Sequence, residues 1–112
     1  MKSLNEDKLT KIVIDLNELK KRRLDESFLA MFGHWVKSIV GRIFGDTGIP
    51  VSVKGNPSDV RAFASAVGSE ARYIQAAKDF GLDHPRTYMN KAQLEKAVND
   101  FESLTGIKWP FK

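Results

Sequence analysis

Apolar residues recur at three- and four-residue steps over residues 27–45, which carry the clearest hydrophobic pattern of the chain. Because residues three and four apart share one helical face, this spacing predicts an amphipathic helix over residues 27–44. The opposite face carries small and basic residues, among them His34, Lys37 and Arg42. The helix has to bury its apolar stripe in a core, in a partner or at a lipid interface. That stripe consists of Phe28, Phe32, Trp35, Val36, Ile39, Val40, Ile43 and Phe44.

The N-terminal residues carry a second helical pattern. Residues 3–6 have the form of a capping box, and Leu9, Ile12, Leu16 and Leu19 follow at helical spacing. We therefore expect a helix over about residues 4–22. Its apolar seam is too short for a coiled coil, so packing against the next helix is favoured over self-association. The predicted organisation is an N-terminal helical arm, residues 1–23, and a compact α-rich domain, residues 24–112.

The period changes at residues 49–54, where Val51 and Val53 alternate with polar residues as in a half-buried strand. A helix is expected from Pro57 to Gly68 and another from Ser69 to Phe80. The offsets over residues 60–80 are similar to those of a DNA-binding helix-turn-helix. The acidic Glu70 opens the would-be recognition helix, and an acid there repels phosphate. Two short helices packed at an angle are therefore the preferred interpretation.

The C-terminal part predicts a loop, a helix and a strand. Residues 82–89 read as a loop because Pro85 disfavours helix before it, and Asn90 would cap a helix that ends at Gly106. Residues 107–111 alternate in polarity and could pair with residues 50–54 at a sheet edge. The predicted fold class is mainly α, with about five helices and a short two-stranded β ribbon formed by residues 50–54 and 107–111.

Composition excludes several classes of protein. The chain of 112 residues has no cysteine, which rules out disulfide scaffolds and thiol chemistry. Its net charge is +4, and the excess lies mainly in the N-terminal half, where Lys20, Lys21, Arg22 and Arg23 are adjacent. These four cations fit phosphate binding, but they also fit the solvated last turn of a helix. The longest apolar stretch is too short and too basic to span a membrane.

The sequence contains little that indicates an enzyme. The two histidines, His34 and His84, have no metal-ligand partner at a suitable spacing, and His34 is expected to be an exposed surface residue. Nucleophile elbows, phosphate-binding loops and dinucleotide-binding glycine patterns are absent. We therefore expect no enzyme, no cofactor, no metal site and no small-molecule substrate.

Several segments resemble small uncharacterised proteins of tailed bacteriophages. The similarity covers residues 24–112 and is carried by the segments 24–28, 31–33, 53–57, 70–73, 81–88 and 106–112. It implies a viral origin and a non-enzymatic role in the virion or its assembly, and it transfers no functional residues. It also implies a location in the virion or the host cytoplasm; without it, a cytoplasmic location is expected.

The sequence thus favours a structural or assembly protein that acts through protein contacts, with a protein partner or self-association. The expected partner-binding residues are Phe28, Phe32, Trp35, Ile39 and Ile43. Two alternatives stay open: a nucleic-acid-binding module that uses residues 20–23 and 60–80, and a peripheral protein that binds an anionic membrane through the amphipathic helix 27–44. Both would use the basic residues Lys20, Lys21, Arg22, Arg23, Lys37 and Arg42.

Overall fold

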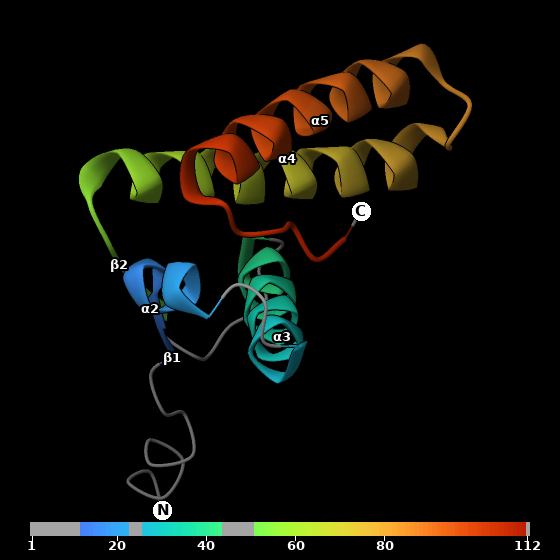
Figure 1. Cartoon of the computed structure of the whole chain (residues 1–112). Helices are drawn as coiled ribbons and strands as arrows, with labels where there is room; N and C mark the ends of the chain where they lie inside the picture. The colour runs from blue at the N-terminus through green and yellow to red at the C-terminus, as the bar shows by residue number, and fades with distance from the viewer. Residues whose placement is uncertain (1–11, 23–25, 44–50, 112) are drawn as a thin grey trace, which may run out of the picture.

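The structure, a computed structural model, describes residues 12–22, 26–43 and 51–111. The elements follow in the order β1 (Ile12–Asp15), α2 (Leu16–Lys21), α3 (Glu26–Ile43), β2 (Val51–Lys54), α4 (Pro57–Phe80) and α5 (Pro85–Thr105). Figure 1 shows α4 and α5 side by side as a long hairpin, with α3 and the β1–α2 unit against one side of it. The tail, residues 106–111, returns between the hairpin and α3. The mainly α fold with a short two-stranded sheet is confirmed.

The two strands pair in parallel, with Ile12 opposite Val51 and Asp15 opposite Lys54. The helix expected over residues 4–22 is therefore wrong at residues 12–15, while residues 1–11 lie outside the described residues. β-Branched residues favour a strand here, and Asp15 then caps α2. Its carboxylate accepts hydrogen bonds from the backbone N–H groups of Asn17 and Glu18, at 3.0 and 3.3 Å.

The ribbon expected between residues 50–54 and 107–111 is also wrong, because β2 pairs with β1 and the tail forms no strand. The tail backbone is satisfied by side chains instead. The hydroxyl of Thr105 accepts a hydrogen bond from the N–H of Ile107, at 3.1 Å. Gly106 ends α5 with a φ of 77°, a left-handed conformation that favours glycine.

A single helix of 24 residues, α4, replaces the two helices expected over residues 57–80. Gly68 continues the helix, and the helix-turn-helix-like arrangement over residues 60–80 is absent. A glycine inside a helix costs about 1 kcal/mol relative to alanine. Burial of the apolar side chains of Val67 and Ala71 on either side of Gly68 offsets that cost.

The loop expected over residues 82–89 is shorter in the structure, because α5 begins at Pro85 rather than at Asn90. The Nδ1 atom of His84 accepts a hydrogen bond from the N–H of Arg86, at 3.1 Å, and so caps the helix. The buried hydroxyl of Thr87 donates to the carbonyl of Gly81, at 2.7 Å. This contact fixes the turn between α4 and α5.

The core forms where α3, the hairpin, the tail and the β1–α2 unit meet. Four rings, those of Phe32, Phe63, Phe101 and Trp109, pack with centroid separations between 5.6 and 6.3 Å. Ile14, Leu16 and Leu19 are fully buried in the same cluster. The β1–α2 unit thus contributes one apolar face to the core.

Candidate functional site

The apolar stripe of α3 packs mainly into the chain's own core. Of the residues expected to bind a partner, Phe32 is fully buried, whereas Trp35 and Ile39 are partly buried and packed against the core. The side chains of Phe28 and Ile43 lie outside the described residues. On the other face His34 is exposed, as expected.

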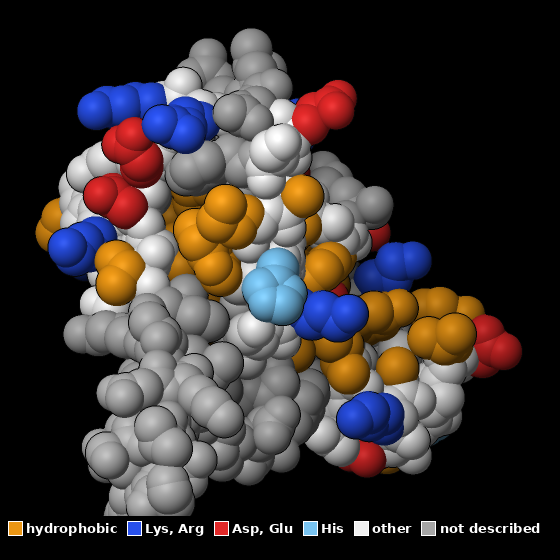
Figure 2. Space-filling view, turned by 90° about the horizontal axis from the view of Figure 1, so that it is seen from below, with side chains coloured by type: hydrophobic (Ala, Val, Ile, Leu, Met, Phe, Trp, Pro, Cys, Tyr) orange, Lys and Arg blue, Asp and Glu red, His pale blue; other side chains and the backbone are white. Residues whose placement is uncertain are grey.

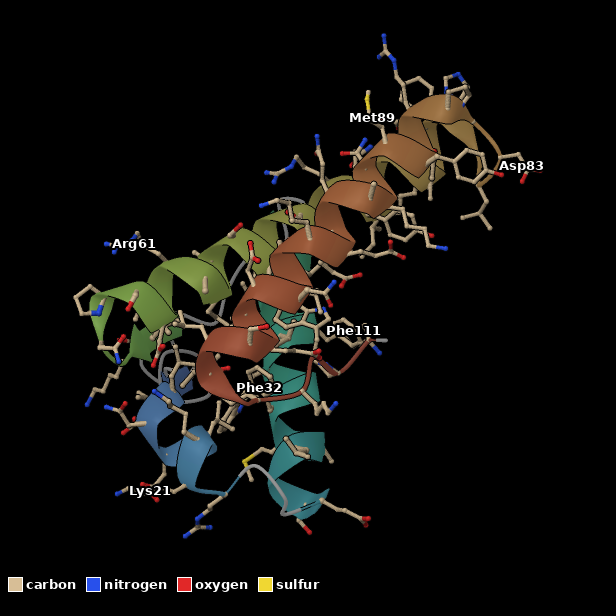
Figure 3. All side chains as sticks on the ribbon, turned by 45° about the horizontal axis from the view of Figure 1, so that its top comes forward. Lys21, Phe32, Arg61, Asp83, Met89 and Phe111 are labelled. Carbon is tan, nitrogen blue, oxygen red and sulfur yellow. The ribbon has the colours of Figure 1, made fainter. Side chains whose placement is uncertain are left out.

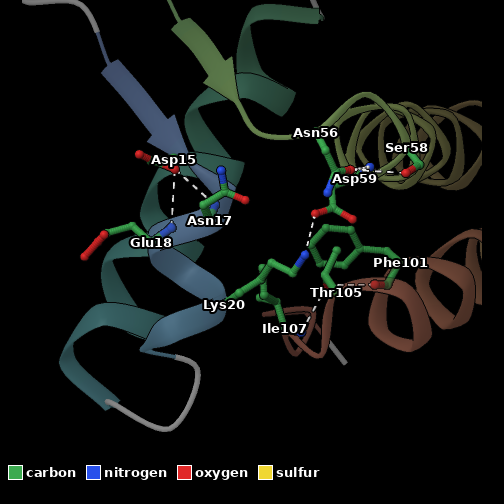
Figure 4. A network of polar contacts seen from close by, with 10 residues as sticks. All are labelled: Asp15, Asn17, Glu18, Lys20, Asn56, Ser58, Asp59, Phe101, Thr105 and Ile107. Carbon is green, nitrogen blue, oxygen red and sulfur yellow. Dashed lines mark hydrogen bonds and ion pairs between the residues drawn. The ribbon is translucent and has the colours of Figure 1, made fainter.

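The basic residues have different surroundings in the structure. The Nζ atom of Lys20 lies 2.8 Å from Oδ2 of the buried Asp59, at the first turn of α4 (Figure 4). Lys21 and Lys37 are exposed, and Arg22 lies 3.7 Å from Glu18 in an exposed pair. Arg23 and the side chain of Arg42 lie outside the described residues. Lys20 therefore has a structural role that the sequence pattern does not reveal.

Trp109 anchors the tail to both helices of the hairpin. Its backbone N–H donates to Oε2 of Glu102 on α5, at 2.7 Å, and its indole Nε1–H donates to Oε1 of Glu70 on α4, at 2.8 Å. On the α3 side, a Cβ atom placed on Gly33 would lie 3.2 Å from Pro110, so the tail approaches α3 closely there. The tail is therefore held by specific contacts on three sides.

A pocket lies between the hairpin and the tail, lined by residues of α4, α5 and the tail. Its volume is about 470 Å³. Figure 3 shows Phe111, one of its lining residues, on the tail beside α5. The remaining walls combine apolar, aromatic and a few polar side chains, namely those of Glu70, Tyr73, Lys91, Leu94, Glu95, Val98, Asn99 and Trp109. Pockets with apolar walls and a few convergent polar groups are the usual form of a binding site.

Glu70 is the most unusual residue of this pocket. It is only 6% exposed, and its hydrogen bond to Trp109 uses one carboxylate oxygen, Oε1. The other oxygen, Oε2, has no hydrogen-bond or ion-pair partner among the described residues, and it is not sealed from solvent. Glu70 is also one of the residues that line the pocket.

The sequence does contain a sign that Glu70 is unusual. The comparison with a helix-turn-helix hides it, because that comparison places Glu70 at the start of a separate helix. Glu70 lies at helical spacing from Phe63, Val67 and Ile74, so a carboxylate interrupts an otherwise apolar stripe. Its partner Trp109 is distant in the chain, and no periodicity connects the two.

Large hydrophobic side chains are also exposed at the turn of the hairpin, namely those of Phe80, Leu82, Tyr88 and Met89. The ring of His84 stacks on Phe80 at 4.7 Å, and the guanidinium of Arg86 lies 5.2 Å from the Phe80 centroid. Figure 3 shows Met89 and Asp83 at this far end of the hairpin. Seen from below, hydrophobic side chains reach the surface in two areas with Lys and Arg beside them (Figure 2). The turn forms an exposed surface patch, whereas the pocket at the tail is lined by residues of two helices and the tail.

Within residues 12–22, 26–43 and 51–111, no three His, Asp or Glu side chains gather as a metal site would require. The helices of this part of the chain are also not long and apolar enough to cross a bilayer. No protein-family model, no curated protein and no solved structure matches the chain.

Proposed function

We propose that this protein acts without catalysis, by binding a segment of a partner protein in the pocket between α4, α5 and the tail. The observation that carries the proposal is the pocket itself, about 470 Å³ in volume, with Leu94, Val98, Trp109 and Phe111 among its lining residues. Apolar grooves beside helices are a common way to hold a peptide, because buried side chains supply affinity while a few polar groups fix orientation.

Two features favour this function over nucleic-acid binding. Lys20, one of the four adjacent cations, is engaged by Asp59 inside the chain. The helix-turn-helix-like unit that this alternative would need over residues 60–80 is replaced by one continuous helix, so the element that would enter a DNA groove is missing.

The location of the apolar residues favours this function over binding to a membrane surface. A helix that lies in a lipid interface presents its apolar face outward. On α3, the side chains of Phe32, Val36 and Val40 are buried in the core.

The resemblance to tailed-bacteriophage proteins favours a partner that belongs to a virus particle or to its assembly.

The test is selection of binders from a random peptide library displayed against the immobilised full chain. Asn99→Trp should fill the pocket from its rim, because Asn99 is exposed and lines the pocket. The matched control is Gln93→Trp on the same helix, since Gln93 is exposed and is not a lining residue. Selected peptides should bind Asn99→Trp about tenfold more weakly or worse and bind the control normally. Failure to enrich any peptide that Asn99→Trp weakens would overturn the proposal.

A further inference from the structure

Glu70 is a buried acid whose described surroundings supply no cation. A buried carboxylate is costly unless charges or several hydrogen bonds compensate it. Its only hydrogen bond among the described side chains comes from the neutral indole of Trp109, and no lysine or arginine among the described residues forms an ion pair with it. A positive group is therefore the chemical complement of this position.

The other walls of the pocket suit an organic cation rather than a metal ion. Tyr73, Trp109 and Phe111 present aromatic rings, which attract ammonium and guanidinium groups through their negative faces. Leu94 and Val98 supply apolar surface against which a methylene chain can pack. A metal ion would instead require several oxygen or nitrogen ligands at short range.

Charge at the rim agrees with this chemistry. Glu95 adds a second carboxylate to the lining residues, and Lys91 is the single basic residue among them. Neither Lys91 nor Glu95 forms an ion pair within the described part of the chain. The two acids outnumber the one base, so the pocket attracts a cation that approaches from solvent.

We propose that the pocket receives a lysine or arginine side chain of the partner protein. The cationic end binds Oε2 of Glu70, and the methylene stem lies against Leu94, Val98 and the aromatic rings. This inference rests on the proposed function, because it names the group of the partner segment that enters the pocket. Trp109 has a positioning role, since its indole N–H holds Oε1 and leaves Oε2 for the ligand.

The test uses small probes, so that it does not depend on finding the partner. N-acetyl-arginine amide and N-acetyl-lysine amide are titrated into the full chain, with the uncharged citrulline and norleucine analogues as matched controls. The reporter is the indole N–H resonance of Trp109, which is directly bonded to Glu70 and is distinguished from that of Trp35 with a Trp35→Phe variant. The cationic probes should shift this resonance with millimolar affinity, and the uncharged analogues should bind about tenfold more weakly or worse.

Glu70→Gln isolates the charge, because the glutamine carbonyl can still accept from the indole of Trp109. This variant should lose the preference for cationic probes, whereas Glu95→Gln at the exposed rim should weaken them by about twofold at most. Equal shifts by arginine and citrulline, or an unchanged preference in Glu70→Gln, would overturn the inference. Peptides that depend on the pocket but bind Glu70→Gln normally would leave the proposed function intact and reject the cation alone.

Discussion

Asp59 and Glu70 are both buried acids on α4, yet their surroundings differ. Asp59 is 1% exposed, lies in the first turn, has the positive end of the helix nearby and pairs with Lys20 at 2.8 Å. Glu70 is 6% exposed, lies in the middle of the helix and accepts from a neutral indole. The chain supplies a cation to the first acid, whereas the second lines a pocket and has one carboxylate oxygen without a hydrogen-bond partner among the described residues. Burial alone therefore does not distinguish a structural carboxylate from a candidate ligand-binding one. The ion-pair and hydrogen-bond partners of the carboxylate distinguish them.

The largest loss of stability is expected when Trp109, the hydrogen-bond donor to Glu70, is removed. Trp109→Ala should lower the free energy of unfolding by about 3–5 kcal/mol. It removes one ring from the aromatic cluster, leaves a cavity there and removes the hydrogen-bond donor to Glu70. Trp109→Phe keeps most of the ring packing and should lose about 1–3 kcal/mol. Urea denaturation measures both variants. A loss below about 1 kcal/mol for Trp109→Ala would mean that the tail is not held as described.

Replacement of Lys20 should leave Asp59 as a buried acid without a paired cation among the described residues, as Glu70 is. Lys20→Met keeps much of the methylene stem and should cost about 1–3 kcal/mol. The value lies below that for a fully buried pair because the Lys20 side chain is 33% exposed. Thermal and urea unfolding measure the loss, and Asp59→Asn in the same background should restore part of it. Full stability in Lys20→Met alone would remove the distinction between the two acids.

Neutralisation of each acid should change the free energy of unfolding by different amounts. Asp59→Asn breaks the ion pair and should destabilise the fold by about 1–2 kcal/mol. Glu70→Gln should change stability by about 0.5 kcal/mol or less, because the hydrogen bond to Trp109 survives and no ion pair among the described residues is lost. Parallel denaturation curves give the comparison. An equally large loss for Glu70→Gln would contradict it.

The smallest effect is expected at Lys21, the neighbour of Lys20. Changing Lys21 to glutamine should alter stability by about 0.5 kcal/mol or less, because the Lys21 side chain is exposed. Differential scanning calorimetry beside Lys20→Met tests whether Lys20 differs from its neighbour in the basic run. A loss as large as that of Lys20→Met would show that position 20 is not special.

Patterns that depend on neighbouring residues predict much of this fold. The helix over 27–44 was visible from its apolar spacing, and Gly81 and Gly106 end helices as expected. The strand at residues 12–15 was missed because Ile12, Leu16 and Leu19 also satisfy helical spacing. Its true partner, β2, is remote in the chain, and no local pattern identifies it.

The candidate site was harder to predict than the fold, because its parts come from α4, α5 and the tail. Gly68 and Ser69 suggested a helix end, which placed Glu70 at the start of a short helix rather than on a buried face. A glycine next to well-buried neighbours is tolerated within a helix, and this tertiary effect outweighs its intrinsic preference. The pairing of Glu70 with Trp109, 39 residues apart, emerges only when the tail folds back.

The parallel pairing of β1 and β2 has a kinetic consequence. The strands are joined through α2 and α3, so their contact requires closure of a long loop before any hydrogen bond between them is formed. The α4–α5 hairpin, whose helices are joined by a short turn, needs no such closure. The hairpin should therefore be structured in the folding transition state, with strand pairing completed afterwards. Truncation of the fully buried Ile14 in β1 should then mainly accelerate unfolding, whereas truncation of Val98 in α5 should mainly slow folding.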